Sequence, residues 1–150
     1  MPVKKLAWLT LFMALAGFLA AQAADEVDRI LATPEITCSQ AARFVLAAAR
    51  SLPDGGEAFA AAKENRWLPG QAKADDPIRL GELAQLIMGA FDLRGGIMYN
   101  TFPVPRYACR TLVYKHIIRG RTDPDGRLDG RAFLQILSRV LSYTGEGLDE

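Results

Sequence analysis

The chain has 150 residues, of which 50% are hydrophobic and 23% charged, with 18 lysines and arginines against 17 aspartates and glutamates. This near-neutral balance argues against nucleic acid as the main partner, because phosphate binding needs a concentrated basic surface. The length and the apolar content fit one ordinary folded domain.

Residues 1–23 have the pattern of a secretory signal peptide. Lys4 and Lys5 precede the apolar run Leu6–Ala21, and an Ala-Gln-Ala triplet at its end suits a signal peptidase. An uncleaved membrane anchor is the alternative, because the run is only slightly shorter than the roughly 17–25 apolar residues that span a bilayer. Cleavage is favoured because no stop-transfer flank follows. We therefore expect an exported protein of the periplasm or cell envelope.

A lead-in at 24–33 precedes the first predicted helix, which runs from Cys38 to Arg50. Thr37 and Gln40 have the spacing of a capping box, in which each side chain binds the other residue's backbone N–H. Apolar residues recur in this helix at intervals of three and four, as a buried helical face requires. They are Ala41, Phe44, Val45, Ala48 and Ala49.

The next two helices are predicted at Glu57–Arg66 and Leu80–Phe91, with a polar loop at Gln71–Pro77 between them. The second of these helices has one continuous apolar stripe. Its members are Leu83, Leu86, Ile87, Ala90 and Phe91. Arg94–Pro103 contains two adjacent glycines and is predicted to be irregular.

The last two helices are predicted from Pro105 to about His116 and from Asp129 to about Tyr143. Proline suits a first helical turn, where its missing N–H costs nothing, and aspartate is a good N-cap. The final helix carries Phe133, Leu134, Ile136, Leu137, Val140 and Leu141 as its apolar residues. Residues 144–150 form a predicted acidic tail.

The second half of the chain repeats its apolar pattern at an offset of 50 residues. Glu57–Leu93 aligns on Tyr107–Tyr143 without a gap, and a shorter first copy covers about 34–50. Repeats of this size mark units that bury their apolar faces by stacking on one another. We therefore expect a single all-α domain at 34–143 built of repeated helix-loop-helix units, and a binding scaffold in preference to an enzyme.

Three sequence motifs in the last copy resemble those of the surface-layer homology (SLH) domain family. Phe102–Ala108 is similar to the family's F-P-D-V-P-x-x-W-A, Ile117–Gly120 to its G-I-I-x-G and Pro124–Leu128 to its P-D-G-x-F. The middle copy keeps a proline-isoleucine pair and Glu82 of the P-I-T-R-A-E segment. The resemblance covers about Pro34–Tyr143.

SLH domains come in sets of three, pack as an α-helical spindle with pseudo-threefold symmetry, and attach envelope proteins to cell-wall polymers or peptidoglycan. The resemblance therefore implies a pseudo-threefold bundle that binds wall polymer. Its T-R-A-E motif is altered here, because Cys38, Leu80 and Gly130 stand at the position of the arginine. The glutamate of the motif is kept only at Glu82.

Polymer binding on this scaffold requires cations and hydrogen-bonding groups in grooves between copies, with an aromatic face for sugar rings. Arg79 and Arg131 flank the lost motif arginine and offer replacements for it. The alternative is that the tyrosine packs at the edge of the core and the arginines form a solvated face. The candidate ligand-binding residues are Arg79, Glu82, Arg106, Tyr107, Arg119, Gly120 and Arg131.

A second functional hypothesis uses the same scaffold without glycan binding. In it, the chain is a protein-protein adaptor or envelope assembly factor, and the loop Arg94–Thr101 meets a partner protein. Ile97, Met98 and Tyr99 would supply the contact, and an exposed cluster of these three would favour this hypothesis. A groove flanked by Glu82, Tyr107 and nearby arginines would instead favour polymer binding.

Catalytic and metal-binding signatures are sparse, so we expect neither an enzyme nor a cofactor or metal site. His116 is the only histidine, which excludes a multi-histidine metal site. An EF-hand at Asp123–Asp129 would place Arg121 and Ala132 at its two end ligands, so these aspartates are predicted to make a turn and a cap instead.

The chain has two cysteines, Cys38 and Cys109, and both lie in the predicted exported part. An oxidising compartment permits a disulfide between them. Both also sit within apolar helical patterns, which fits two small buried side chains equally well. The sequence leaves the choice open.

Overall fold

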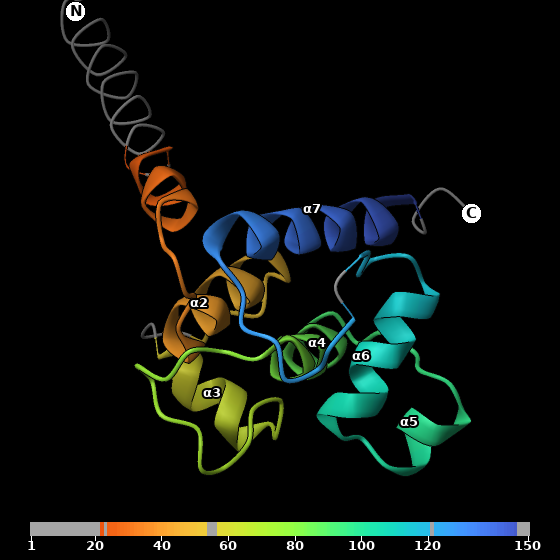
Figure 1. The fold of residues 1–150 in the computed structure, drawn as a ribbon. Helices are drawn as coiled ribbons and strands as arrows, with labels where there is room; N and C mark the ends of the chain where they lie inside the picture. The colour runs from red at the N-terminus through yellow and green to blue at the C-terminus, as the bar shows by residue number, and fades with distance from the viewer. Residues whose placement is uncertain (1–21, 23, 54–56, 121, 147–150) are drawn as a thin grey trace, which may run out of the picture.

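The computed structural model describes residues 22, 24–53, 57–120 and 122–146, and these residues form an assembly of helices (Figure 1). The described residues contain no β-strand; two isolated bridges join Thr37 to Pro77 and Arg79 to Arg127. The predicted all-α class is therefore confirmed. The labelled helices are α2 (Cys38–Ala48), α3 (Ala58–Glu64), α4 (Leu80–Ala90), α5 (Ile97–Thr101), α6 (Pro105–Tyr114) and α7 (Gly130–Glu146).

Side-chain caps fix where α2 and α7 begin. The Gln40 N–H donates to Thr37 Oγ1 at 3.3 Å, and the Thr37 N–H donates to Gln40 Oε1 at 3.0 Å, so the predicted capping box is present. At α7 the Ala132 N–H donates to Asp129 Oδ1 at 2.8 Å, which confirms the aspartate as the predicted cap. These bonds satisfy backbone donors that have no partner inside the helix.

The prediction that Arg94–Pro103 is irregular is wrong in its centre, where α5 forms one short helix. Thr101 Oγ1 donates to the Ile97 carbonyl at 2.8 Å, and Asn100 Nδ2 donates to the Gly95 carbonyl at 3.3 Å. These local bonds hold five residues that are too few to show a helical period in the sequence.

The two ends of the described chain are also more helical than the sequence suggests. Residues 24–31, within the predicted lead-in, are helical, and α7 continues through the first residues of the predicted tail. Thr144 Oγ1 donates to the Val140 carbonyl at 3.0 Å in this added turn. The predicted signal peptide, apart from residue 22, and the tail residues 147–150 lie outside the described residues. No helix in the described ranges has the length and apolar character needed to cross a membrane.

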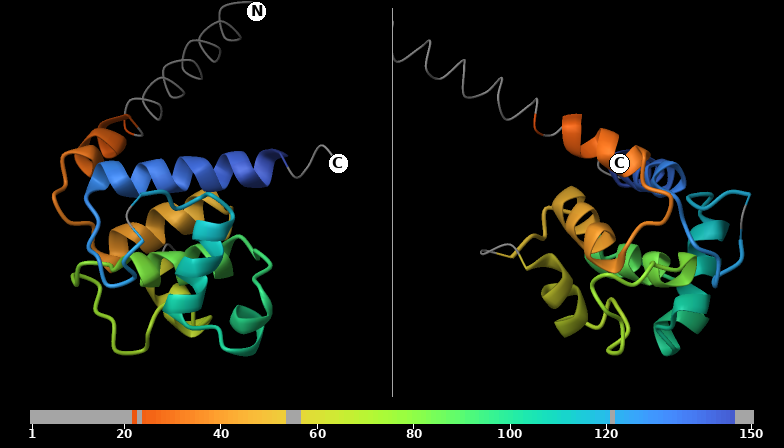
Figure 2. Two further views of the ribbon diagram at one scale, coloured as in Figure 1. Left: turned by 45° about the vertical axis from the view of Figure 1, so that its right-hand side comes forward. Right: turned by 60° about the vertical axis from the view of Figure 1, so that its left-hand side comes forward.

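The core lies between α2, α4, α6 and α7. In Figures 1 and 2, α7 crosses the top of the molecule above α2, and α4 lies beneath them beside α6. The Phe44 and Phe133 rings join α2 to α7 edge to face, with centroids 6.2 Å apart. The predicted stripe of α4 is buried except for a half-buried Phe91, whereas Leu141 on α7 is 45% exposed.

The turns that follow α2, α3, α4 and α6 share one backbone geometry. Arg50, Arg66, Asp92 and His116 have φ values of 54, 59, 50 and 59°, which lie in the left-handed region. In each turn the next residue donates its N–H to the carbonyl five residues earlier, at 2.8–3.0 Å. This is the Schellman pattern, which satisfies the last carbonyls of a helix. The α3 and α6 turns recur at the 50-residue offset of the apolar pattern.

Loop residues that precede α2, α4 and α7 meet in the interior. The Ile78 N–H donates to the Ile36 carbonyl at 2.8 Å, and the Ile36 N–H donates to the Leu128 carbonyl at 2.9 Å. All three side chains are buried. The backbone therefore joins segments that lie more than 40 residues apart in sequence.

Residues 24–33 pack against the first turn of α7. Ile30 is 3% exposed, and the Gly130 N–H donates to the Thr33 carbonyl at 2.9 Å. A Cβ on Gly130 would overlap the Ile30 carbonyl oxygen. Glycine is therefore required here because two backbones approach closely.

Candidate functional site

Three of the predicted ligand-binding residues face one hollow. Arg79 and Glu82 come from the start of α4, and Arg106 comes from the start of α6. The hollow has a volume of about 460 Å³, and we call it the Arg79 groove. Its remaining lining residues are Pro69, Gln71, Val104, Pro105, Pro124 and Asp125.

A glycine allows the walls of the Arg79 groove to come together. The Gly81 N–H donates to the Pro124 carbonyl at 2.8 Å. A Cβ on Gly81 would lie 3.1 Å from Pro105 Cβ and 3.2 Å from the Pro124 carbonyl oxygen, closer than ordinary packing. The start of α4 is thus pressed directly onto the segments before α6 and α7.

The charges in the groove are balanced and accessible. Arg79 Nη1 lies 3.3 Å from Asp125 Oδ1, and the two side chains are 60% and 81% exposed. Exposed ion pairs contribute only about 0–1 kcal/mol, so an anionic ligand can displace Asp125 from Arg79. Glu82 Oε2 accepts the Arg79 backbone N–H at 3.0 Å, which positions the carboxylate at the start of α4. The guanidinium of Arg79 has no acceptor, so only this half of a capping box forms.

A second hollow of about 290 Å³ continues the Arg79 groove. The two share Gln71, Arg79 and Glu82, and the second adds Asp76 and Arg127. Arg127 Nη1 lies 2.9 Å from Glu35 Oε1, and this hydrogen bond raises the pKa of the Arg127 guanidinium. Three arginines therefore lie along one continuous polar surface.

The other predicted ligand residues lie elsewhere. Arg119 lines a separate hollow with Asp129 and Arg139, and its Nε donates to the His116 carbonyl at 2.9 Å. Gly120 is exposed and has a φ of 82°, which suits its place in the turn after α6. Arg131 is exposed and lines neither the Arg79 groove, nor the hollow that continues it, nor the hollow of Arg119.

Tyr107 does not line the groove that holds Glu82 and Arg106, so the two do not flank one groove with it as predicted. Tyr107 lines a hollow between α5 and α6, away from the Arg79 groove. Successive residues of an α-helix point about 100° apart, since one turn takes 3.6 residues. Arg106 and Tyr107 therefore face different hollows.

The Arg79 groove and the Arg119 hollow occupy matching places in two copies. Their linings share positions at the 50-residue offset, with Arg79 matched by Asp129 and Glu82 matched by Ala132. Pro69 of the groove likewise matches Arg119. The two copies thus each form a concavity at a corresponding place, with volumes of about 460 and 170 Å³ and with different charges.

The sequence interpretation missed Gln71 and Asp125 of the Arg79 groove and Arg127 of the hollow that continues it. Asp125 and Arg127 stand in the segment that resembles the family's P-D-G-x-F motif. The resemblance therefore pointed to this segment, but its residues were interpreted as a turn and not as part of a binding site. Asp123 Oδ1 does accept the Asp125 N–H at 3.1 Å, as the predicted turn requires.

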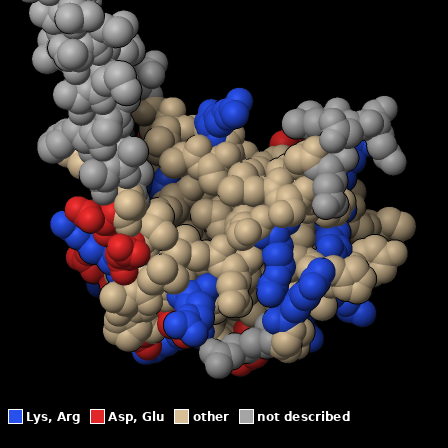
Figure 3. All heavy atoms as spheres, turned by 90° about the horizontal axis from the view of Figure 1, so that it is seen from above, with Lys and Arg blue, Asp and Glu red and all other residues tan. Residues whose placement is uncertain are grey.

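Figure 3 shows that, seen from above, basic side chains are spread over the surface while acidic ones gather mainly at one edge.

The two cysteines are free and buried, so the structure contains no disulfide between them. Cys38 and Cys109 are each 1% exposed. Burial, with Glu82 and Asp76 nearby, raises the pKa of Cys38 to about 11, and burial also raises the pKa of Cys109. Thiols in this state are poor nucleophiles. Within the described ranges no three histidine, cysteine or acidic side chains are grouped to hold a metal ion.

Neither a protein-family model, nor a curated protein, nor a solved structure matches this chain. The functional interpretation therefore rests on the geometry and charges of the grooves themselves.

Proposed function

We propose that the protein is an exported, non-catalytic module that binds cell-wall polymer or peptidoglycan in the Arg79 groove, on an SLH-like scaffold. The observation that carries this proposal is the meeting of Arg79, Glu82 and Arg106 where the middle copy contacts the last. Two accessible guanidinium groups and a carboxylate in an open groove suit a ligand with both anionic groups and hydroxyls.

The scaffold part of the proposal is a pseudo-threefold arrangement of the three copies. It is supported by the backbone bonds that join Ile36, Ile78 and Leu128, which hold equivalent places before α2, α4 and α7. It is also supported by the recurrence of one left-handed turn after four helices. An arrangement of this kind generates a groove at each contact between copies.

The chemistry of wall polymers fits the groove. Their carboxylates or phosphates match the planar, bidentate donors of arginine. Their hydroxyls match the amide of Gln71 and the carboxylates of Glu82 and Asp125. The volume of about 460 Å³ lies within the roughly 300–1,000 Å³ of small-molecule sites. The residues that line the groove include no aromatic ring, so we expect binding to depend on charge and to weaken with salt.

The direct test is co-sedimentation of a chain that begins at residue 24 with purified peptidoglycan sacculi. The test variant is Arg79→Ala with Arg106→Ala. The matched control is Arg29→Ala with Arg94→Ala, which removes the same charge from exposed positions outside the grooves. Circular dichroism checks that all three chains are folded.

The proposal expects the wild type and the control to sediment with the sacculi, and the groove variant to stay in solution. Sedimentation of the groove variant at the wild-type level would show that these arginines do not bind the polymer. A wild type that stays in solution would remove polymer binding altogether.

A further inference from the structure

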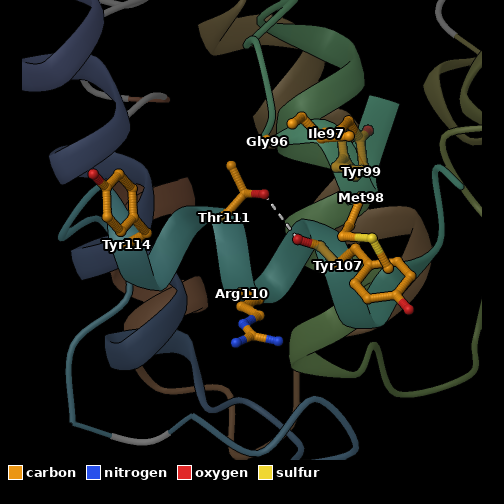
Figure 4. A pocket seen from close by; sticks show the side chains of 8 residues that line it. All are labelled: Gly96, Ile97, Met98, Tyr99, Tyr107, Arg110, Thr111 and Tyr114. Atoms are coloured by element: carbon orange, nitrogen blue, oxygen red, sulfur yellow. Dashed lines mark hydrogen bonds between the residues drawn. The ribbon is translucent and has the colours of Figure 1, made fainter. Parts of the chain in front are cut away.

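A second concave surface lies between α5 and α6, and we call it the hairpin groove. It has a volume of about 380 Å³. Its floor is the outer face of α6, where Arg110, Thr111 and Tyr114 follow Tyr107 by three, four and seven residues and so share one helix face. Helix α5 forms the opposite side with Ile97, Met98 and Tyr99. Figure 4 shows Tyr107 and Tyr114 at opposite ends, with Arg110 and Thr111 between them.

The apolar side chains around the hairpin groove are unusually accessible. Ile97 is 84% exposed, Met98 is 52% exposed and Tyr114 is 85% exposed. Helix α5 contains no buried residue, and Phe102 beyond its end is 58% exposed. Clustered exposed apolar residues of this kind mark interaction surfaces, whereas isolated ones are ordinary.

The charge of this region has a single sign. Residues 93–122 contain six basic residues and no acidic residue, whereas all 17 acidic residues lie outside this range. Arg110 is the charged residue that lines the hairpin groove. The surface therefore combines apolar contact with positive charge.

We propose that the hairpin groove is a docking site for a partner protein, which inserts a segment with apolar and acidic side chains. The apolar side chains would enter between α5 and α6, and a carboxylate would pair with Arg110. The seven-residue step from Tyr107 to Tyr114 spans about 10 Å of helix, a length that two turns of a partner helix match.

A concave floor favours a peptide segment over a lipid surface. Tyr107 on the floor is half-buried, whereas Ile97 and Met98 on the α5 side are 84% and 52% exposed, so the groove has a recessed floor below a projecting rim. A membrane would instead contact only the projecting rim. The proposal is independent of polymer binding, because the hairpin groove and the Arg79 groove share no lining residue.

The test begins with a phage-displayed peptide library selected on the chain that begins at residue 24. Enriched peptides are expected to be rich in aspartate or glutamate and in leucine or aromatic residues. One enriched peptide is then synthesised, its dissociation constant is measured by fluorescence anisotropy, and its site is mapped by amide chemical shifts. Tyr99, Arg110 and Thr111 are the signals expected to move.

The test variants are Ile97→Ser and Arg110→Glu, and the matched controls are Leu52→Ser and Arg29→Glu, which change exposed residues elsewhere. Each test variant is expected to weaken peptide binding by at least about tenfold, and each control by less than twofold, since charge reversal at a contact is costly. Equal weakening by the controls, or selection of basic peptides, would overturn the proposal.

Two further results would also overturn it. The selection could enrich no peptide while the chain binds phosphatidylglycerol vesicles and Ile97→Ser abolishes that binding. This result would assign the surface to a membrane. Concentration-dependent dimerisation in analytical ultracentrifugation that Ile97→Ser abolishes would assign it to a second copy of this chain.

Discussion

Gly130 offers a sharp test of the way residues 24–33 are attached. The substitution Gly130→Ala places a methyl group on the Ile30 carbonyl oxygen and 3.3 Å from Leu31 Cα. Both obstacles are backbone atoms, so no side chain can rotate away. We expect residues 24–33 to detach from the first turn of α7.

Detachment would break one backbone hydrogen bond and expose one buried side chain. The bond from the Gly130 N–H to the Thr33 carbonyl contributes about 0.5–1.5 kcal/mol. Burial of Ile30, which is 3% exposed, contributes about 1.5–3 kcal/mol. Alanine regains up to about 1 kcal/mol through its higher helix propensity. The free energy of unfolding should therefore fall by about 1–4.5 kcal/mol.

Urea unfolding followed by circular dichroism measures this change. Gly145→Ala is the matched control on the same helix, because a Cβ there meets nothing within 4 Å; it should leave the stability unchanged or slightly higher. A chain that begins at residue 34 lacks the obstructing backbone, so Gly130→Ala should cost nothing in it. A Gly130→Ala protein as stable as the wild type, or a penalty that persists in the shorter chain, would refute the reasoning.

Three further changes test the core, the cap and the buried thiol. Phe133→Ala removes a fully buried ring and should lower the free energy of unfolding by about 3–5 kcal/mol. The control Leu141→Ala, at a 45% exposed position, should lower it by less than about 1 kcal/mol. Equal losses in urea unfolding would contradict the described core. Thr37→Ala breaks the capping box and should cost about 1 kcal/mol by the same assay, and an unchanged midpoint would count against the cap. The pKa of Cys38 is raised from 9.0 to about 11 on folding, so the folded state keeps its proton to higher pH than the unfolded chain. The stability that this protonated thiol contributes is present below pH 9 and is lost as the pH rises from 9 to about 11. Cys38→Ala should lessen this loss. If the free energy of unfolding of the variant depended on pH as that of the wild type does, the thiol would not be responsible.

Local signals in the sequence predicted much of the helical framework. Thr37 with Gln40 marks the start of α2, and Asp129 marks the start of α7, because these side chains bind the N–H groups that a helix start leaves free. Pro105 likewise stands at the first position of α6. These signals depend on neighbours within four residues, so the sequence alone carries them.

Features that depend on distant parts of the chain were not predictable. Nothing near Ile30 in the sequence indicates that its backbone meets α7, and Gly130 resembles any other glycine until the two are seen together. The same holds for the candidate site. The resemblance suggested one groove flanked by Tyr107 and nearby arginines, but the adjacent residues Arg106 and Tyr107 point in different directions. Only the packing of the helices determines which hollow each side chain faces.

The two proposed grooves can be separated in a single experiment. Soluble peptidoglycan fragments released by enzymatic digestion are titrated into the isotope-labelled chain, and amide chemical shifts are recorded. Polymer binding in the Arg79 groove predicts saturable shifts at Gln71, Arg79, Gly81, Glu82 and Arg106, which the Arg79→Ala, Arg106→Ala variant abolishes. An absence of shifts at any fragment concentration, or shifts confined to α5 and the outer face of α6, would contradict polymer binding in this groove.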